Sequence, residues 1–246
     1  EEGLIFKGGS GAGLNLSRIR SSKELLSSGG TASGPVSFMR GADASAGTIK
    51  SGGATRRAAK MVVLDVDHPD IAEFIETKAK EENKIRVLRD AGFDMDLGGE
   101  DIISVQYQNA NNSVRVSDEF MRAVESDNDA GAAFGLRARQ TGEVIETVDA
   151  RELFGKITQA AWDCAAPGIQ YDDTINDWHT SPESGRINAS NPCSEYMHMD
   201  NSSCNLASLN LMKFLSDDGV FDAATFAKAV EFVITAMDIS ICFADF

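Results

Sequence analysis

The segment Met61-Val62-Val63-Leu64-Asp65-Val66 decides the fold of this chain. It is rich in β-branched residues and almost continuously apolar, whereas a strand with one solvated face alternates between apolar and polar residues. The run therefore predicts a strand that is buried on both faces. Asp67 follows it as the expected N-cap of a helix with an apolar stripe of Ile71, Phe74 and Ile75. A buried strand that leads directly into a helix favours an α/β fold with parallel strands.

Weaker patterns extend this alternation along the rest of the chain. Residues 8–13 predict a glycine-rich loop that leads into a short strand around Leu14 and Leu16. Residues 166–192 are rich in Pro, Gly, Asn and Asp and predict a long irregular segment. The other expected elements are a helix after Gly34-Pro35, a strand at 102–107, a hairpin around 141–143, and helices with the N-caps Ser117, Asp149 and Asp222.

The composition of the 246 residues is that of a globular protein, with 42% hydrophobic and 25% charged residues. A net charge of −15 argues against a nucleic-acid-binding surface, which needs clustered Lys and Arg. The sequence has no apolar run of about 18 residues that predicts a membrane span, and no visible signal peptide. Its four cysteines contain no CxxC spacing, which favours a reducing, cytoplasmic compartment.

The two ends of the sequence indicate a piece of a longer chain. There is no initiator Met, and residues 239–246 are mostly apolar without a polar tail. We therefore expect residues 1–246 to form one partial domain that is truncated at both ends.

The candidate for chemistry is the segment Asn191-Pro192-Cys193-Ser194-Glu195, which is followed by Cys204. A carboxylate two positions from a cysteine can accept a proton near the thiol, and a polar loop is an unusual place for a structural cysteine. A second thiol nearby could form a disulfide with the first, or with a third cysteine. From the residues alone, a reactive Cys193 and a buried structural Cys193 remain equally open.

Zinc binding and core packing are the plainer interpretations of the cysteines. A zinc site from Cys193, Cys204, His179 and His198 matches no standard ligand spacing and is a minor alternative. Cys164 and Cys242 lie in apolar patterns, so we expect both in the core.

Two glycine-rich segments, 8–13 and 50–57, are candidate nucleotide contacts. Glycines let a backbone approach an anion closely, and the second segment adds the cations Lys50, Arg56 and Arg57. A solvated turn is the alternative for each segment.

Six motifs together resemble one known family. In chain order they are Gly-Gly-Ser-Gly-Ala-Gly-Leu-Asn-Leu-Ser-Arg-Ile-Arg at 8–20, Ser-Gly-Pro-Val-Ser-Phe-Met at 33–39, Gly-Gly-Ala-Thr-Arg-Arg at 52–57, His-Pro-Asp-Ile-Ala-Glu-Phe-Ile at 68–75, Asn-Pro-Cys-Ser-Glu-Tyr at 191–196 and Cys-Asn-Leu-Ala-Ser-Leu-Asn-Leu at 204–211. The set is similar to the catalytic subunit of ribonucleotide reductases, most of all to the adenosylcobalamin-dependent class. The last two motifs are the most specific.

The resemblance implies a ten-stranded α/β barrel, of which residues 1–246 would hold about the first half and a central finger loop. It implies that Cys193 becomes a thiyl radical that takes the 3′-hydrogen of a ribonucleotide. It further implies that Glu195 is the general base, that Asn191 binds the sugar hydroxyls, and that Cys204 is one of two reducing thiols.

The resemblance also implies ligands and partners. Ser10 and Gly11 would lie against the substrate. The residues near an effector, a deoxynucleotide or ATP, would be Arg18, Arg20, Lys50, Arg56 and Arg57. The implied cofactor is adenosylcobalamin, the implied reductant is of the thioredoxin or glutaredoxin type, and the implied assembly is a homodimer.

Two rival functions share these residues. An iron- or manganese-dependent reductase uses the same barrel but takes its radical from a second subunit. A non-catalytic nucleotide-binding regulatory protein would keep both glycine-rich segments without a need for Cys193. One departure concerns the second segment, in which Ala58 follows the two arginines where the family usually has Gly.

Overall fold

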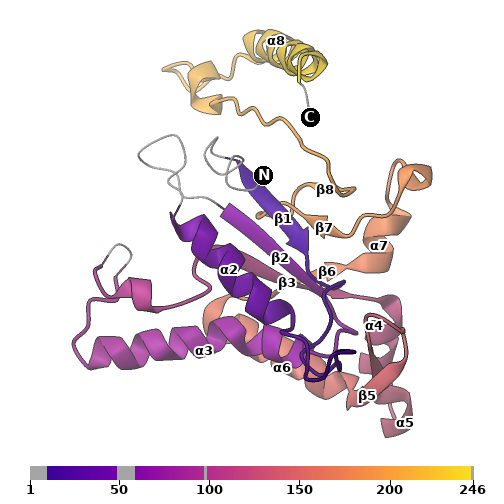
Figure 1. Ribbon diagram of the computed structural model, residues 1–246. Coiled ribbons are helices and arrows are strands. Elements are labelled where there is room, and N and C mark those ends of the chain that lie inside the picture. Colours follow the sequence, from indigo (N-terminus) through magenta and orange to yellow (C-terminus); the bar gives the residue numbers. More distant parts are fainter. Residues whose placement is uncertain (1–9, 49–58, 97–98, 245–246) are drawn as a thin grey trace. The chain divides into compact units, whose positions relative to one another are not determined.

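The fold is built on a sheet of four parallel strands (Figure 1). The computed structural model describes residues 10–48, 59–96 and 99–244. The strands are β1 (Gly11–Asn15), β2 (Ala59–Asp65), β3 (Ala110–Val116) and β6 (Gly168–Tyr171), in the order β1-β2-β3-β6. Each neighbouring pair is parallel. The α/β class and the parallel pairing predicted from the Met61–Val66 run are therefore confirmed.

One face of the sheet, here called the helix face, is mostly apolar. Alternate residues of the central strands, such as Val62 and Val114, point to this face and are fully buried. They pack against helices, of which α3 contributes Phe74 and α6 contributes Ile157. The helices on this side are α2 (Pro35–Thr48), α3 (Ile71–Asp90) and α6 (Ala150–Cys164). Burial of these side chains is the main stabilising term of the domain.

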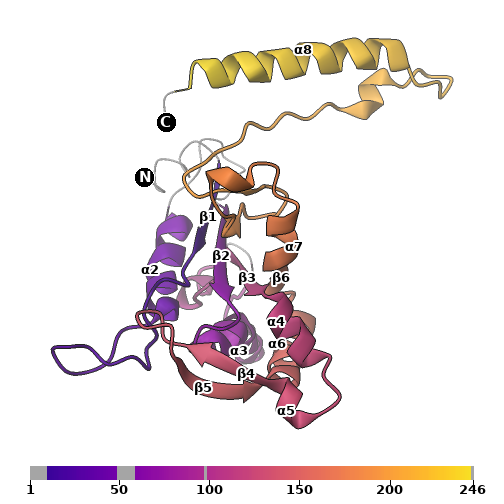
Figure 2. The same cartoon turned by 90° about the vertical axis from the view of Figure 1, so that its right-hand side faces the viewer.

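The opposite face, here called the hairpin face, carries the buried apolar residues Met61 and Val63 of β2, flanked on the neighbouring strands by small and polar residues. The small and polar residues are Gly11, Gly13 and Asn15 of β1, Asn111, Ser113 and Arg115 of β3, and Gln170 of β6. A short antiparallel hairpin of β7 (Ala189–Ser190) and β8 (Met197–His198) lies on this side, with α7 (Asp172–Asp177) beside it. In Figure 2, α2 and the region of α7 lie on opposite sides of the strands.

Helix α3 begins later than the sequence pattern predicts. Asp67 is not its N-cap, because the N-cap is Asp70 and the helix starts at Ile71. The reason is Pro69, whose ring disfavours helical geometry in His68, the residue before it. Asp67 instead forms an ion pair with Arg139, at 2.9 Å between Oδ1 and the guanidinium.

One strand prediction is wrong, and one strand was not predicted. Residues 102–107 were expected to form a strand, but Ile102–Ser104 is a 3-10 helix that packs on the small cluster of Ile85, Met95 and Val105. The true strand, β3, was missed because its buried face alternates with Asn111, Ser113 and Arg115. The segment 166–192 is less irregular than predicted, since β6 lies within it.

The first glycine-rich segment is also partly misread. Gly11 and Gly13 belong to strand β1 itself, not to a loop that precedes it. The segment resembles a loop because glycine weakens strand propensity, but the close packing of the hairpin requires glycine at these positions.

The expected caps and hairpin are confirmed. Ser117 Oγ accepts a hydrogen bond from Phe120 N at the start of α4 (Asp118–Val124), and Asp149 caps α6 by accepting from Arg151 N and Glu152 N. The predicted hairpin is β4 (Ala133–Arg137) and β5 (Val144–Asp149). The short helices are α5 (Asp129–Ala132) and the 3-10 turn Pro182–Ser184.

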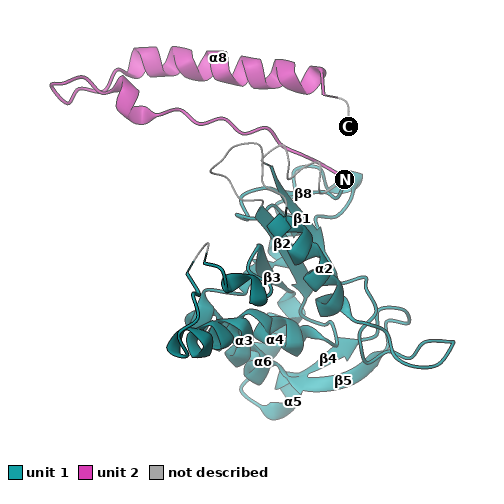
Figure 3. Cartoon of the chain, turned by 60° about the vertical axis from the view of Figure 1, so that its left-hand side comes forward, with its two compact units in different colours: residues 1–200 teal, residues 201–246 magenta. Residues whose placement is uncertain are grey.

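Residues 201–246 form a second compact unit, separate from residues 1–200 (Figure 3). It contains a 3-10 helix (Leu211–Phe214) and α8 (Ala223–Cys242), with the predicted N-cap Asp222 accepting from Thr225 N. Phe226 contacts Phe214 and Phe221, with ring centroids 5.3 and 5.5 Å apart. Within this unit no residue of α8 is buried, including its apolar residues Phe226, Val230, Val233, Ile234 and Met237. A unit this small lacks a second layer that could cover a long apolar helix.

The two cysteines expected in the core are not fully buried. Cys242 is exposed at the end of α8, because that helix has no buried face. Cys164 is half-buried, and its thiol donates to Ala160 O at 3.4 Å. Among the described residues, no helix is long and apolar enough to cross a membrane.

A buried histidine ties the segment after β1 to the turn after β2. His68 is fully buried, and its Nδ1 accepts a hydrogen bond from Asp70 N at 3.0 Å. Its other ring nitrogen, Nε2, therefore carries the proton and donates to Ile19 O at 2.9 Å. Burial lowers the pKa of His68, and the nearby Arg139 acts in the same direction.

The lowered pKa of His68 predicts a loss of stability in acid. Between the folded pKa and the unfolded value of about 6.5, the unfolded state binds more protons, so the free energy of unfolding falls as pH falls. We expect His68→Gln, which keeps a donor and an acceptor but does not titrate, to lose less stability than the wild type between about pH 7.5 and about pH 5.5. Urea denaturation at both pH values measures this. Equal losses in the two proteins would contradict the prediction.

Candidate active site

The predicted reactive cysteine lies at the tip of the β7–β8 hairpin. Ala189 pairs with His198 and Ser190 with Met197, so residues 191–196 form the connecting loop. Cys193 is exposed in this loop, whereas the preceding Pro192 is buried. The thiol is therefore accessible, while the residue before it is fixed by packing.

The loop is closed by its own asparagine. Asn191 Oδ1 accepts from Tyr196 N at 3.0 Å, and Asn191 O accepts from Ser194 N at 3.1 Å. Ser194 has a φ of +64°, in the left-handed region that non-glycine residues adopt rarely. Cys193 and Glu195 are both exposed on this tight turn.

The hairpin packs directly against the backbone of β1. A Cβ atom at Gly13 would lie 1.8 Å from Ser190 O, and one at Gly11 would lie 2.7 Å from Pro192 Cγ. Any side chain at either position would therefore overlap the hairpin. The two glycines have a steric role that the predicted glycine-rich loop does not explain.

Side-chain amides from three strands hold the segment that leads to the cysteine. Asn15 of β1 donates through Nδ2 to Asn188 O at 2.8 Å, and Asn111 of β3 donates through Nδ2 to Pro192 O at 2.8 Å. Gln170 of β6 donates through Nε2 to Ser190 Oγ, also at 2.8 Å. Each bond joins the hairpin face of the sheet to the hairpin, so the loop is fixed from several sides.

Arg115 secures the start of the same segment. Its guanidinium donates to Gln170 Oε1 at 3.1 Å and to Ile187 O at 2.5 Å, and it forms an ion pair with Asp172, which also contacts Arg186. The Arg115 side chain is only 2% exposed. A buried cation is tolerated when its donors are satisfied in this way, and removal of one partner would leave an uncompensated charge.

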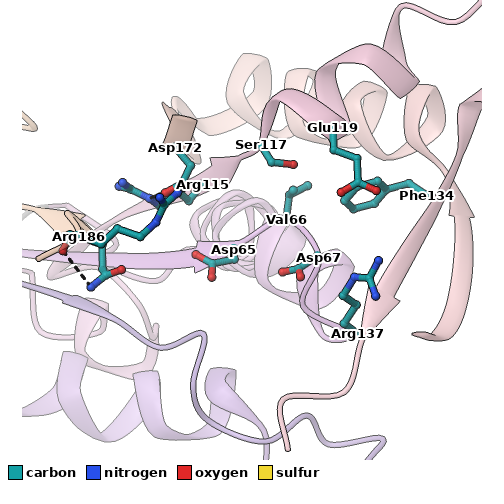
Figure 4. A pocket seen from close by; sticks show the side chains of 11 residues that line it. Asp65, Val66, Asp67, Arg115, Ser117, Glu119, Phe134, Arg137, Asp172 and Arg186 are labelled. Atoms are coloured by element: carbon teal, nitrogen blue, oxygen red, sulfur yellow. Dashed lines mark hydrogen bonds and ion pairs between the residues drawn. The ribbon is translucent and has the colours of Figure 1, made fainter. Parts of the chain in front are cut away.

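A pocket of about 230 Å³ opens at the carboxyl ends of β2 and β3 (Figure 4). Its walls include Arg115, Asp172 and Arg186, together with Asp65 and Asp67. Burial raises the pKa of Asp65, whose carboxylate accepts from Asn15 Nδ2 at 3.1 Å. Several of these charges are already used to hold Ile187 and the turn after β2. The pocket is thus lined by the residues that anchor the segment before the loop. It lies at the carboxyl ends of the strands, whereas Gly11 lies at their amino ends.

The structure brings together some of the predicted site residues and separates others. Gly11 lies beside Pro192, and Ser10 is exposed directly before it. Arg18 and Arg20 follow the opposite end of β1, at Asn15, which is about 13 Å from Gly11 along the strand. Cys204 is exposed in the second unit, so its approach to Cys193 stays a prediction. Lys50, Arg56 and Arg57 lie outside the described residues.

Four residues of the site were missed by the sequence analysis: Asn15, Asn111, Arg115 and Gln170. The alternation of polar residues in Ala110–Val116 was an available signal, since it marks a strand with one polar face. Their contacts with the hairpin carry no signal in the sequence.

The described residues contain no group of three or more His, Cys, Asp and Glu side chains arranged to hold a metal ion. His179 and His198, the histidines of the zinc alternative, have ring centroids 6.3 Å apart. The ring of His198 stacks on Tyr196 at 5.3 Å, which gives it a packing role in the hairpin.

The fold and site define an α/β domain in which a cysteine-bearing hairpin lies across a parallel sheet. The family model for the ribonucleotide reductase barrel domain matches residues 1–246. The chain therefore belongs to the ribonucleotide reductase family. The prediction of a partial α/β barrel from this family is confirmed.

Curated relatives give the same family over the whole chain. The vitamin B12-dependent ribonucleotide reductase of Streptomyces clavuligerus is 83% identical over 250 residues, which cover 100% of this chain and 26% of that protein. The enzyme of the same name from Rhodopirellula baltica is 51% identical over 245 residues, with 100% and 23% coverage. The chain spans about a quarter of the length of these relatives.

A solved structure supports the fold. The alpha subunit of the class Id ribonucleotide reductase of Actinobacillus ureae aligns with a TM-score of 0.52 and 17% sequence identity. The alignment covers 80% of this chain and 28% of that subunit. At this identity the likeness concerns the architecture alone.

The contact between the hairpin and β1 predicts a strong effect of Gly13→Ala. The added methyl group would overlap Ser190 O, so the hairpin must move away from the sheet, at a cost of about 1–3 kcal/mol in the free energy of unfolding. Gly155→Ala is the matched control, because its Cβ would meet nothing within 4 Å and it lies inside α6. Urea denaturation of both variants measures the difference. Equal stability of the two variants would show that the hairpin does not lie on β1.

Proposed function

We propose that this chain is the cysteine-bearing part of an adenosylcobalamin-dependent ribonucleotide reductase, which converts ribonucleoside di- or triphosphates to deoxyribonucleotides. The observation that carries the proposal is the exposed thiol of Cys193 at the tip of a rigidly held loop. A hydrogen-abstracting group must be accessible to the substrate yet fixed in position, and this loop meets both requirements.

The residues of the loop have separate roles in the proposed reaction. A thiyl radical at Cys193 takes the hydrogen atom from C3′ of the ribose, and Glu195 accepts the proton of the 3′-hydroxyl. Asn191 uses its Oδ1 to close the loop, so its amide Nδ2 is the group that donates to a sugar hydroxyl. The 2′-hydroxyl leaves as water with a proton from a pair of thiols that includes Cys204. The pair provides two electrons and its second hydrogen to C2′ and becomes a disulfide, and Cys193 returns the hydrogen atom to C3′.

Adenosylcobalamin fits the described residues at one point, the open tip of the hairpin. The cysteine and the carboxylate there are both exposed, so the sulfur is accessible from outside the loop. When bound, the cofactor supplies the radical that takes the hydrogen atom of the thiol, and the protein supplies placement.

The partners follow from the same proposal. A reductant of the thioredoxin or glutaredoxin type regenerates the thiols, and the full-length protein acts in the cytoplasm as a homodimer. A deoxynucleotide or ATP effector binds near Arg18, Arg20, Lys50, Arg56 and Arg57. Because Arg18 and Arg20 lie beyond the far end of β1, these two would act at a distance from Cys193.

The metal-dependent reductase is the second candidate. The class Id alpha subunit shares this architecture, so the fold alone does not distinguish the radical source. The high identity to relatives named vitamin B12-dependent favours cobalamin. Product formation by the full-length protein with and without adenosylcobalamin decides between the two, since the metal-dependent enzyme would not respond.

Replacement of the radical thiol should abolish turnover. In the full-length protein with adenosylcobalamin, we expect Cys193→Ser to reduce deoxynucleotide formation to background. The O–H bond of serine is stronger than the S–H bond of cysteine, so the side-chain radical does not form. Effector nucleotide should bind as in the wild type. Cys164→Ser, which changes a cysteine on α6, is the control and should remain active. Unchanged turnover in Cys193→Ser would refute the radical assignment.

Replacement of the second thiol should separate hydrogen abstraction from reduction. We expect Cys204→Ser to stop repeated turnover, since the disulfide cannot form, while hydrogen abstraction at C3′ continues. Release of tritium from 3′-labelled substrate measures the abstraction step independently of product. If tritium release also disappears, Cys204 and Cys193 do not have separate roles.

A further inference from the structure

Pro192, the residue directly before the candidate radical cysteine, is held from two strands of the sheet. Its ring packs against β1, where the absence of a side chain at Gly11 leaves room for it. Its carbonyl oxygen accepts the hydrogen bond from Asn111 Nδ2 of β3, at 2.8 Å. Because proline has no N–H, this carbonyl is its one backbone group that can form a hydrogen bond.

A bond to the Pro192 carbonyl acts directly on Cys193. The carbonyl group of Pro192 and the Cα of Cys193 belong to the same planar peptide unit. When the oxygen is held by Asn111 and the ring by Gly11, that plane has little freedom to tilt or translate. The position of the sulfur relative to this fixed peptide plane then depends only on two torsions of Cys193, φ and the first side-chain torsion.

The adjacent Asn112 makes none of these contacts. Strand alternation turns it to the helix face, where it is 4% exposed and pairs in register with Val62. Its Oδ1 and Nδ2 have no hydrogen-bond partner among the described residues. The two asparagines share a residue type and a strand, but only Asn111 reaches the hairpin.

We propose that Asn111 is a positioning residue for Cys193, and that its amide fixes the height of the sulfur above the sheet. The inference rests on the proposed function, because it concerns hydrogen abstraction by that sulfur. Asn111 acts through the backbone of Pro192 and not through the nucleotide. Its loss therefore lowers kcat and leaves KM unchanged. A displacement of about 1 Å in a reacting atom lowers the rate by about 10²-fold.

The test compares substitutions at the two asparagines in the full-length protein with adenosylcobalamin. Asn111→Asp keeps the shape of the side chain but places an acceptor against the Pro192 carbonyl, and Asn111→Ala removes the group. We expect both to lower kcat and the rate of tritium release from 3′-labelled substrate by about 10²-fold, with KM unchanged. Asn112→Ala is the matched control and should retain wild-type kcat.

Cys193→Ser and thermal melting complete the test. Active Cys193→Ser would refute the proposed function as a whole, whereas inactive Cys193→Ser with fully active Asn111 variants would overturn only the positioning role. A rise in KM with unchanged kcat would also overturn it, because it would place Asn111 against the substrate. If Asn111→Ala has a much lower melting temperature than the wild type, the kcat of the isosteric Asn111→Asp decides whether Asn111 has the positioning role. Equal losses of kcat in the Asn111 and Asn112 variants would assign the effect to general destabilisation and overturn the proposal.

Discussion

The structure of this chain depends on the close approach of a hairpin backbone to strand β1. Ser190 and Pro192 occupy the space where side chains at Gly13 and Gly11 would otherwise lie. Without that contact the amides of Asn15 and Asn111 would lose the backbone carbonyls that they bind, and Cys193 would lie on an unsupported loop. The two glycines weaken β1 as a strand, and this local cost is offset by the docking of the hairpin.

The sheet can both support a core and hold the hairpin because its two faces differ chemically. The helix face is mostly apolar and stabilises the domain through burial. The hairpin face adds, beside Met61 and Val63, amides and an arginine whose groups bind backbone oxygens. Polar groups of this kind add little net stability, but they favour one position of the loop because each must find its partner. Arg115 shows this most clearly, since an arginine that is 2% exposed would be costly in any arrangement that left it unpaired.

Prediction from sequence succeeded where the signal was local and failed where it was not. The caps Ser117 and Asp149 and the strand around Val62 were recognisable because their evidence lies within a few residues. Strand β3 was missed, because Arg115 and Asn111 read as surface residues until the hairpin that binds them is known. Cys242 was expected in the core, but the apolar pattern of α8 could not tell which layer, if any, would cover the helix.

The sequence by itself determined the α/β class, the family, and the identity of the loop that carries Cys193, because motifs and periodicity are properties of neighbouring residues. Only the tertiary structure decided how that loop is held. Asn15, Asn111 and Gln170 come from three strands that are distant along the chain, and the parallel order of the sheet brings them to one face. Hydrogen bonds between such distant residues depend on geometry to a few tenths of an ångström, which residue order alone does not specify.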